Sequence, residues 1–217
     1  MTVTYPYPLP FLADLLSIES VTWDIQRNDE LSGSGDGRVW QAELAPPLWT
    51  GNVSLNIGYH NDLKQIAAKI RKLHGAQNSF FLCDPLSEYP QLDPDGSILG
   101  ASVVRVGAIA TDRAGMSLTG LPEGYTLLPG DKMAISYGTS PVRYAFLEFS
   151  EVAIAAPDGT TDVVGVFPNI PLGVVANAVV TLAKPACKVI ILPGSHNPGS
   201  GSGLFTSGAG FKVMQKK

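Results

Sequence analysis

The stretch WTGNVSLNI at residues 49–57 decides the fold class, because large apolar residues alternate along it with polar ones. A period of two is that of a β-strand that buries one side and exposes the other. The apolar phase consists of Trp49, Gly51, Val53, Leu55 and Ile57. The sequence therefore predicts a half-buried strand here.

The same alternation predicts two earlier strands. Residues 21–25 carry Trp23 on the apolar phase, and residues 38–44 carry Trp40 on it. Pro46-Pro47 is expected to close the second strand, because proline cannot donate a hydrogen bond to a sheet. The chain thus opens with three predicted strands in series.

One helix is predicted after these strands. Asn61 occupies the position of an N-cap and Gly75 that of a left-handed C-cap, so both ends carry stop signals. Apolar residues between them recur every three to four positions, which is typical of a helix with one buried side. They are Leu63, Ile66, Ala67, Ile70 and Leu73.

Short strands separated by Gly-rich or Pro-rich turns fill the second half. Such a series is typical of a small β-barrel. The predicted strands of this series are residues 101–110, 116–119, 132–137, 142–155, 163–166 and 178–182. Further strands are predicted on either side of it, at residues 80–83, 187–192 and 211–214. Residues 193–210, which include the run GSGSG at 199–203, are predicted to be a loop.

We interpret the chain as mainly β, with a sandwich-like domain that carries the helix and an inserted small barrel. Residues 1–88 with 188–217 form the first domain, and residues 89–187 form the insertion. Prolines mark both crossing points, at Asp84-Pro85 and at Pro185. This arrangement predicts that residues 80–82 and 189–191 are neighbouring strands of one sheet.

The composition excludes several classes of function. The 217 residues carry a formal net charge of −4, with 45% hydrophobic and 16% charged residues. A phosphate-binding surface needs clustered Lys and Arg, and Lys69-Ile70-Arg71-Lys72 is better explained as a solvated helix face. We expect no membrane insertion, no signal peptide in the proline-broken start, and synthesis in the cytoplasm with both cysteines as free, buried thiols.

Catalytic patterns are absent from the sequence. His60, His74 and His196 are far apart, and none has a second ligand at metal-binding spacing. Asp93-Pro94-Asp95-Gly96 lacks the closing glutamate of a calcium loop and is explained by a turn. We therefore expect no enzymatic activity, no metal and no cofactor.

The three tryptophans and the helix stripe are the candidate site residues. Trp23, Trp40 and Trp49 lie on the apolar phase of their strands, so we interpret them as core or subunit interface, as we do Ile66 and Ile70. Sugar contact by the tryptophan rings is the alternative.

In its order of features, the sequence resembles the distal tail proteins of long-tailed, non-contractile bacteriophages and related gene-transfer particles. The resemblance covers most of the chain. It rests, in order, on Val21-Thr22-Trp23 with Arg27-Asn28, Trp40, the strand at 49–57, the helix at 63–73 with Gly75, Phe80-Phe81-Leu82-Cys83-Asp84-Pro85, Thr119-Gly120-Leu121-Pro122, Leu128-Pro129-Gly130-Asp131-Lys132-Met133-Ala134-Ile135 and Val164-Gly165-Val166-Phe167-Pro168.

The resemblance implies a structural role in the virion. Such proteins form a ring, usually of six copies, that joins the tail tube to the baseplate hub or tail fibres at the tail tip. Their ring domain resembles tail-tube subunits, and the inserted barrel is often of the oligonucleotide/oligosaccharide-binding type. DNA would pass through the channel only as cargo, which suits the acidic net charge. The Tyr-Pro-rich start and residues 195–210 depart from the family and inherit nothing from it.

Three other functions compete with this one. A carbohydrate-binding module would use exposed aromatic residues of the barrel. A tail-tube or tail-terminator subunit would explain the first domain alone, and a hydrolase lacks any catalytic constellation. The aromatic residues available in the barrel are Tyr89, Tyr125, Tyr137, Tyr144, Phe146, Phe149 and Phe167.

Overall fold

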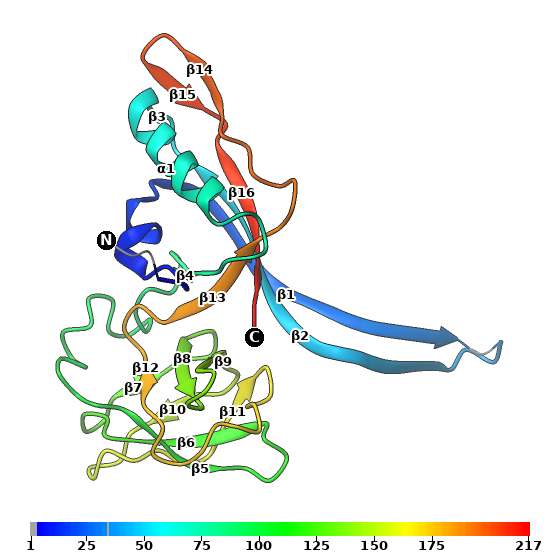
Figure 1. Cartoon of the computed structure of the whole chain (residues 1–217). Coiled ribbons are helices and arrows are strands. Elements are labelled where there is room, and N and C mark those ends of the chain that lie inside the picture. The colour runs from blue at the N-terminus through cyan, green and yellow to red at the C-terminus, as the bar shows by residue number, and fades with distance from the viewer. Residues whose placement is uncertain (1–3, 34) are drawn as a thin grey trace. The chain divides into compact units, whose positions relative to one another are not determined.

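The computed structural model describes residues 4–33 and 35–217 and is mainly β (Figure 1). One α-helix occurs in this part of the chain, α1 at His60–Lys72. The residues group into two units, Met1–Phe80 with Val189–Lys216, and Phe81–Lys188 with Lys217. A five-stranded sheet and a six-stranded sheet form the framework.

The first sheet has five strands in the order β1-β2-β16-β13-β4. Its strand β13 lies beside β4, which confirms the predicted pairing of segments separated by residues 84–185. The strands are β1 (Ile18–Gly33), β2 (Val39–Leu55), β4 (Phe80–Cys83), β13 (Ala186–Ile191) and β16 (Gly210–Gln215).

The prediction of three opening strands is wrong, because β2 runs without interruption through Pro46 and Pro47. The register with β1 shifts at this point, from Asn28 opposite Ala45 to Gln26 opposite Leu48. The prolines therefore lie in an irregularity where the ladder does not require their missing N–H groups. β1 and β2 form one long antiparallel hairpin.

Helix α1 buries the predicted apolar stripe. Leu63, Ile66, Ala67 and Ile70 are all buried, and a small hollow shared with Phe211 marks where they face the sheet. This outcome confirms the period that predicted the helix.

The predicted N-cap is wrong, because α1 begins at His60 and Tyr59 precedes it with no side-chain cap. Tyr59 belongs to the short strand β3 (Gly58–Tyr59), so the chain enters the helix directly from a β ladder. The His60 N–H donates a hydrogen bond to the Leu204 carbonyl at 3.0 Å. This bond satisfies one of the backbone N–H groups at the start of the helix that have no partner within it. The predicted C-cap is also displaced, because Leu73 is the C-cap and is right-handed, and left-handed backbone begins at His74 (φ +51°) and continues at Gly75 (φ +66°).

The region predicted to be a Gly-rich loop contains a hairpin. β14 (Ser200–Ser202) pairs with β15 (Phe205–Ser207), and β15 pairs with β3. Backbone pairing needs no side-chain bulk, and Phe205 adds a large contact by stacking on Tyr59 at 5.3 Å between ring centroids. The low bulk of this region therefore did not prevent a sheet.

The N-terminal Tyr-Pro segment packs at Tyr7 against its own chain. Tyr7 is only 1% exposed and forms a bridge with Phe80. Two short 3₁₀ turns, η1 (Leu9–Phe11) and η2 (Ala13–Leu15), then lead into β1.

The second unit contains a six-stranded sheet in the order β12-β8-β9-β11-β6-β5. A bridge between Arg105 and Val179 connects its two ends, so the sheet is nearly closed and barrel-like. The predicted strand 142–155 is split into two by a turn. The strands are β5 (Arg105–Ile109), β6 (Gly115–Thr119), β8 (Lys132–Tyr137), β9 (Arg143–Phe149), β11 (Val164–Phe167) and β12 (Val180–Thr181), with β7 (Thr126–Leu127) and β10 (Ala153–Ile154) forming a separate pair.

The second unit has a hydrophobic core of its own, whose buried members all lie between Leu99 and Leu182. We therefore expect that replacing residues 84–185 by a short Gly-Ser linker, which keeps β4 and β13, leaves a soluble folded protein. Circular dichroism and a cooperative thermal transition would check this. An insoluble product, with residues 1–83 folding alone, would contradict the predicted insertion.

Candidate assembly surface

The outer part of the β1–β2 hairpin, residues 26–33 and 39–48, is called the arm. Its residues pair across the hairpin, from Gln26 opposite Leu48 to Gly33 opposite Val39. β16 pairs with β2 only from Thr50 to Ser54, so the arm continues past the rest of the five-stranded sheet (Figure 1). Eight residues at about 3.3 Å each make the arm about 25 Å long.

The arm exposes large apolar side chains. An isolated two-stranded ribbon is at best marginally stable in water, because neither face has a core to cover it. Burying one such side chain is worth about 1.5–3 kcal/mol, so the arm has a strong tendency to be covered. The exposed fractions are 68% for Leu31, 66% for Val39, 69% for Trp40 and 68% for Leu44.

The structure separates the three predicted tryptophans. Trp49 is buried, at 2% exposure, and Trp23 is partly buried and stacks on it with 6.4 Å between ring centroids. Gly51 makes room for this pair, since a Cβ there would lie 2.7 Å from the Trp23 ring. Trp40 lies out on the arm and is exposed, so it is not a core residue, and subunit interface and sugar contact stay as its interpretations. Ile66 belongs to the core, as does Ile70.

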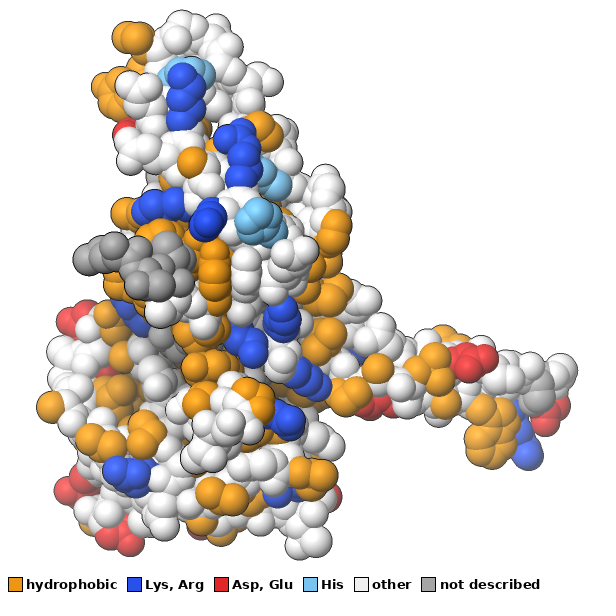
Figure 2. Space-filling view, viewed as in Figure 1, with side chains coloured by type: hydrophobic (Ala, Val, Ile, Leu, Met, Phe, Trp, Pro, Cys, Tyr) orange, Lys and Arg blue, Asp and Glu red, His pale blue; other side chains and the backbone are white. Residues whose placement is uncertain are grey.

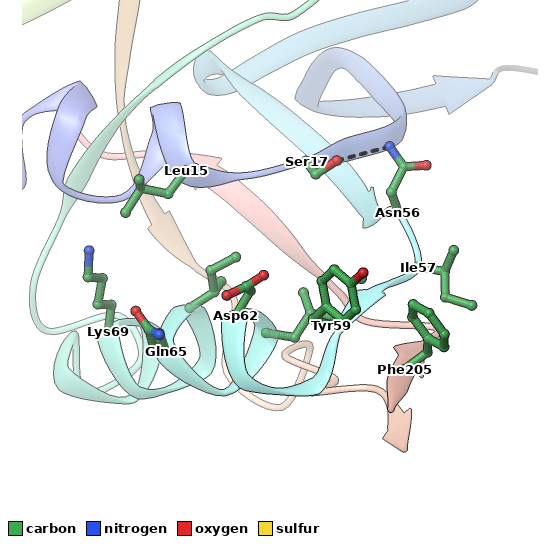
Figure 3. Close-up of a pocket in the computed structure, with 12 residues that line it drawn as sticks. Leu15, Ser17, Asn56, Ile57, Tyr59, Asp62, Gln65, Lys69 and Phe205 are labelled. Atoms are coloured by element: carbon green, nitrogen blue, oxygen red, sulfur yellow. Dashed lines mark hydrogen bonds between the residues drawn. The ribbon is translucent and has the colours of Figure 1, made fainter. Parts of the chain in front are cut away.

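A groove of about 480 Å³ lies at the other end of the same two strands (Figure 3). Its walls come from the turn before β1, the segment after β2, helix α1 and strand β15. The lining residues are Leu15, Ser17, Asn56, Ile57, Gly58, Tyr59, Asp62, Leu63, Gln65, Ile66, Lys69 and Phe205. No sequence signal marked this groove, because it is assembled from four separate segments.

The mouth of the groove is apolar. Tyr59 is 61% exposed and Ile57 is 66% exposed, although Tyr59 stacks on Phe205. Leu204, at 74% exposure, follows β14 on the same hairpin. The arm and the groove are thus two exposed apolar surfaces within one unit.

The two surfaces differ in charge. Helix α1 has four basic residues, Lys64, Lys69, Arg71 and Lys72, and one acidic residue, Asp62. Basic side chains gather over this helix in the space-filling view (Figure 2). Lys69 lines the groove, and its Nζ donates to the Phe11 carbonyl at 2.8 Å. The charged side chains of the arm are three carboxylates and one guanidinium group, Asp29, Glu30, Glu43 and Arg27.

Buried aspartates in the second unit fix its turns, a role that sequence reasoning missed. Asp131 accepts hydrogen bonds from the N–H groups of Gln91, at 2.9 Å, and Leu128, at 2.8 Å. Asp84 is 1% exposed and forms an ion pair with Lys132. The available signals are the Asp-Pro pattern at residues 84–85 and the Pro-Gly-Asp pattern at residues 129–131.

Asp93 plays the same part in the predicted turn at 93–96. Its carboxylate accepts from the N–H groups of Ile98, at 3.0 Å, and Leu99, at 2.9 Å, and from the Tyr125 hydroxyl at 3.1 Å. Burial, and then the bond to this carboxylate, raise the pKa of Tyr125. This carboxylate thus serves structure, as the turn interpretation requires.

The titratable groups within residues 4–33 and 35–217 include three histidines and two cysteines. No group of three or more His, Cys, Asp or Glu side chains there could hold a metal ion. His60 Nδ1 lies 2.9 Å from the Thr206 hydroxyl, and burial lowers the pKa of His196. Both cysteines are free, and burial raises the pKa of the Cys83 thiol to about 12.

No family model matches the sequence, and a comparison with curated proteins finds no similar protein. In the described part of the chain, no helix is long and apolar enough to span a membrane.

Proposed function

We propose that this protein is a structural subunit that assembles with copies of itself into a ring at the distal end of a phage tail. The ring joins the tail tube to the baseplate hub and tail fibres, and DNA crosses its channel only as cargo. The observation that carries the proposal is the arm, an uncovered ribbon with Trp40 at 69% exposure. A surface of this kind is typical of a subunit that is covered on assembly.

Two further features support a structural role. The five-stranded sheet is built from both ends of the chain, and β1 is an edge strand that another subunit could cover. The order of sequence features, from Val21-Thr22-Trp23 to the strand at 164–168, resembles distal tail proteins. These points together favour a ring component of the tail tip.

The sugar-binding alternative has less support. It required exposed, coplanar aromatic rings on the barrel, yet Tyr125, Phe146 and Phe149 are buried. The other four aromatic residues of residues 89–187 are half-buried. The exposed aromatic residues Trp40 and Tyr59 instead lie in the first unit.

The proposal predicts the mass of the purified protein. Light scattering coupled to size-exclusion chromatography should give about six times the 22.9 kDa of one chain, and electron microscopy should show rings with a central channel. Immobilised rings should also capture tail-tube and hub proteins from the same particle. A monomer at every concentration tested would overturn the proposed function.

A further inference from the structure

The arm and the groove lie at opposite ends of the same two strands. Ser17, directly before β1, lines the groove, and β1 ends at the arm tip with Gly33. The 16 residues of β1 span about 50 Å at the usual rise of a strand. The arm therefore cannot reach the groove of its own chain, although it can reach that of a second copy.

We propose that the arm of one copy docks into the α1 groove of the next copy, head to tail, with Trp40 as the anchor. This inference rests on the proposed self-assembly and names the surfaces that make the contact. Aromatic anchors in apolar pockets dominate the energy of many interfaces. The groove offers such a pocket, with Ile57 and Tyr59 exposed at its mouth.

Charge complementarity supports a second copy as the occupant. The arm carries three carboxylates and one guanidinium group, whereas α1, which forms one wall of the groove, carries four basic residues and only Asp62 as an acid. The charged residues that line the groove itself are Asp62 and Lys69, so the positive excess lies on the helix beside it. The opposite net charges of the arm and of α1 favour contact between an arm and the helix that borders the groove, and they disfavour contact between two arms or two such helices. A head-to-tail contact follows, in which each copy gives one arm and receives another.

A contact of this type uses two different patches, so it is heterologous and not two-fold symmetric. Heterologous contacts close into rings when the rotation between copies allows it, and otherwise they run into open filaments. This geometry is the one that a ring of identical subunits needs. The arm–groove contact also differs from backbone pairing along the edge of β1. Edge pairing would leave the apolar side chains on the faces of the arm uncovered.

The first test replaces Trp40 by serine in the full chain. We expect the association between copies to weaken by about 30-fold or more, as for an interface anchor, so that Trp40→Ser sediments as a monomer where the wild type is assembled. Leu15→Glu, at a groove residue with 48% exposure, should have the same effect because it adds a negative charge facing an acidic arm. Leu172→Ser is the control, because Leu172 is 86% exposed and lies outside both surfaces.

Mixing the two variants is the decisive test. Trp40→Ser retains an intact groove and Leu15→Glu retains an intact arm, so a head-to-tail contact predicts one productive pairing and a heterodimer that cannot grow. Sedimentation should show dimers in the mixture and monomers in each separate sample. Circular dichroism should show unchanged folding, since both positions are exposed.

The outcomes separate this inference from the proposed function. A monomeric wild type would overturn the proposed function itself. An assembled wild type whose mass is unchanged in both variants would overturn only the arm–groove contact. Variants that dissociate but give no heterodimer on mixing would also overturn it, because the arm would then be covered by a different surface. Loss of assembly in Leu172→Ser would assign the contact to the second unit and count against it as well.

Discussion

Ile70→Asp is expected to unfold the first unit. Ile70 is 4% exposed and belongs to the buried face of α1, which packs near Phe211 of β16. An aspartate here leaves an unpaired charge in an apolar environment, which costs about 3 kcal/mol or more, and removes the apolar contacts as well. Such a loss is a large part of the 5–15 kcal/mol that stabilises a typical domain. Thermal unfolding followed by circular dichroism should show the transition of this unit lost or strongly lowered.

Ala68→Asp is the matched control for this substitution. Ala68 is exposed on the opposite side of the same helix, so it receives the same side chain without burial. The lower helix propensity of aspartate should cost only about 0.7 kcal/mol or less. Equal melting temperatures for Ile70→Asp and the wild type would mean that the buried face of α1 has been misassigned.

The periodicity of apolar residues was sufficient to predict most elements. The stripe from Leu63 to Ile70 predicted the helix, and the alternation from Trp49 to Leu55 predicted a half-buried strand. Both patterns can be recognised in a short stretch of sequence, because the repeat of a helix or strand determines which of its own residues share a face. The pairing of β4 with β13 also followed, from buried strands on either side of a proline-marked insertion.

Predictions from local sequence failed where a neighbouring strand of the sheet determined the structure. Pro46 and Pro47 were expected to end a strand, yet the register shift beside Asn28 lets the hairpin pass through them. Residues 200–202 were expected to be flexible, yet β15 and β3 provide the backbone partners that order them. In both cases the decisive fact is a neighbouring strand, which lies far away or unpredicted in the sequence.

The assembly surface was only half accessible from the sequence. Trp40 was singled out as core or interface, but its strand phase is the same as that of a core residue. The structure was needed to show that β16 pairs with β2 only from Thr50 to Ser54. Beyond this point no third strand of the described residues pairs with the arm. The groove could not be predicted at all, because its walls meet only after β3 pairs with β15.

Asp84→Ala is expected to destabilise the second unit by about 3–5 kcal/mol, because it removes one partner of a buried ion pair. Asp84 is 1% exposed, and the side chain of Lys132 is 10% exposed, so the remaining ammonium would have little access to water. The same carboxylate accepts the Leu86 N–H at 3.0 Å, which fixes the turn after β4. The variant therefore loses both the charge balance and the turn, and denaturant unfolding of this unit should measure the sum.

Two further variants divide this effect into its parts. Asp84→Asn keeps the size of the side chain and can still accept the Leu86 N–H, so it isolates the loss of charge. Glu88→Gln breaks the pair with Lys184 at 3.8 Å, whose side chains are 44% and 46% exposed, and should cost at most about 1 kcal/mol. Burial also shields the Asp84 pair from counterions, so added salt should leave its contribution nearly unchanged. If Asp84→Ala costs no more than Glu88→Gln, the ion pair does not stabilise the fold. The turn after β4 would then depend on Pro85 and the backbone alone.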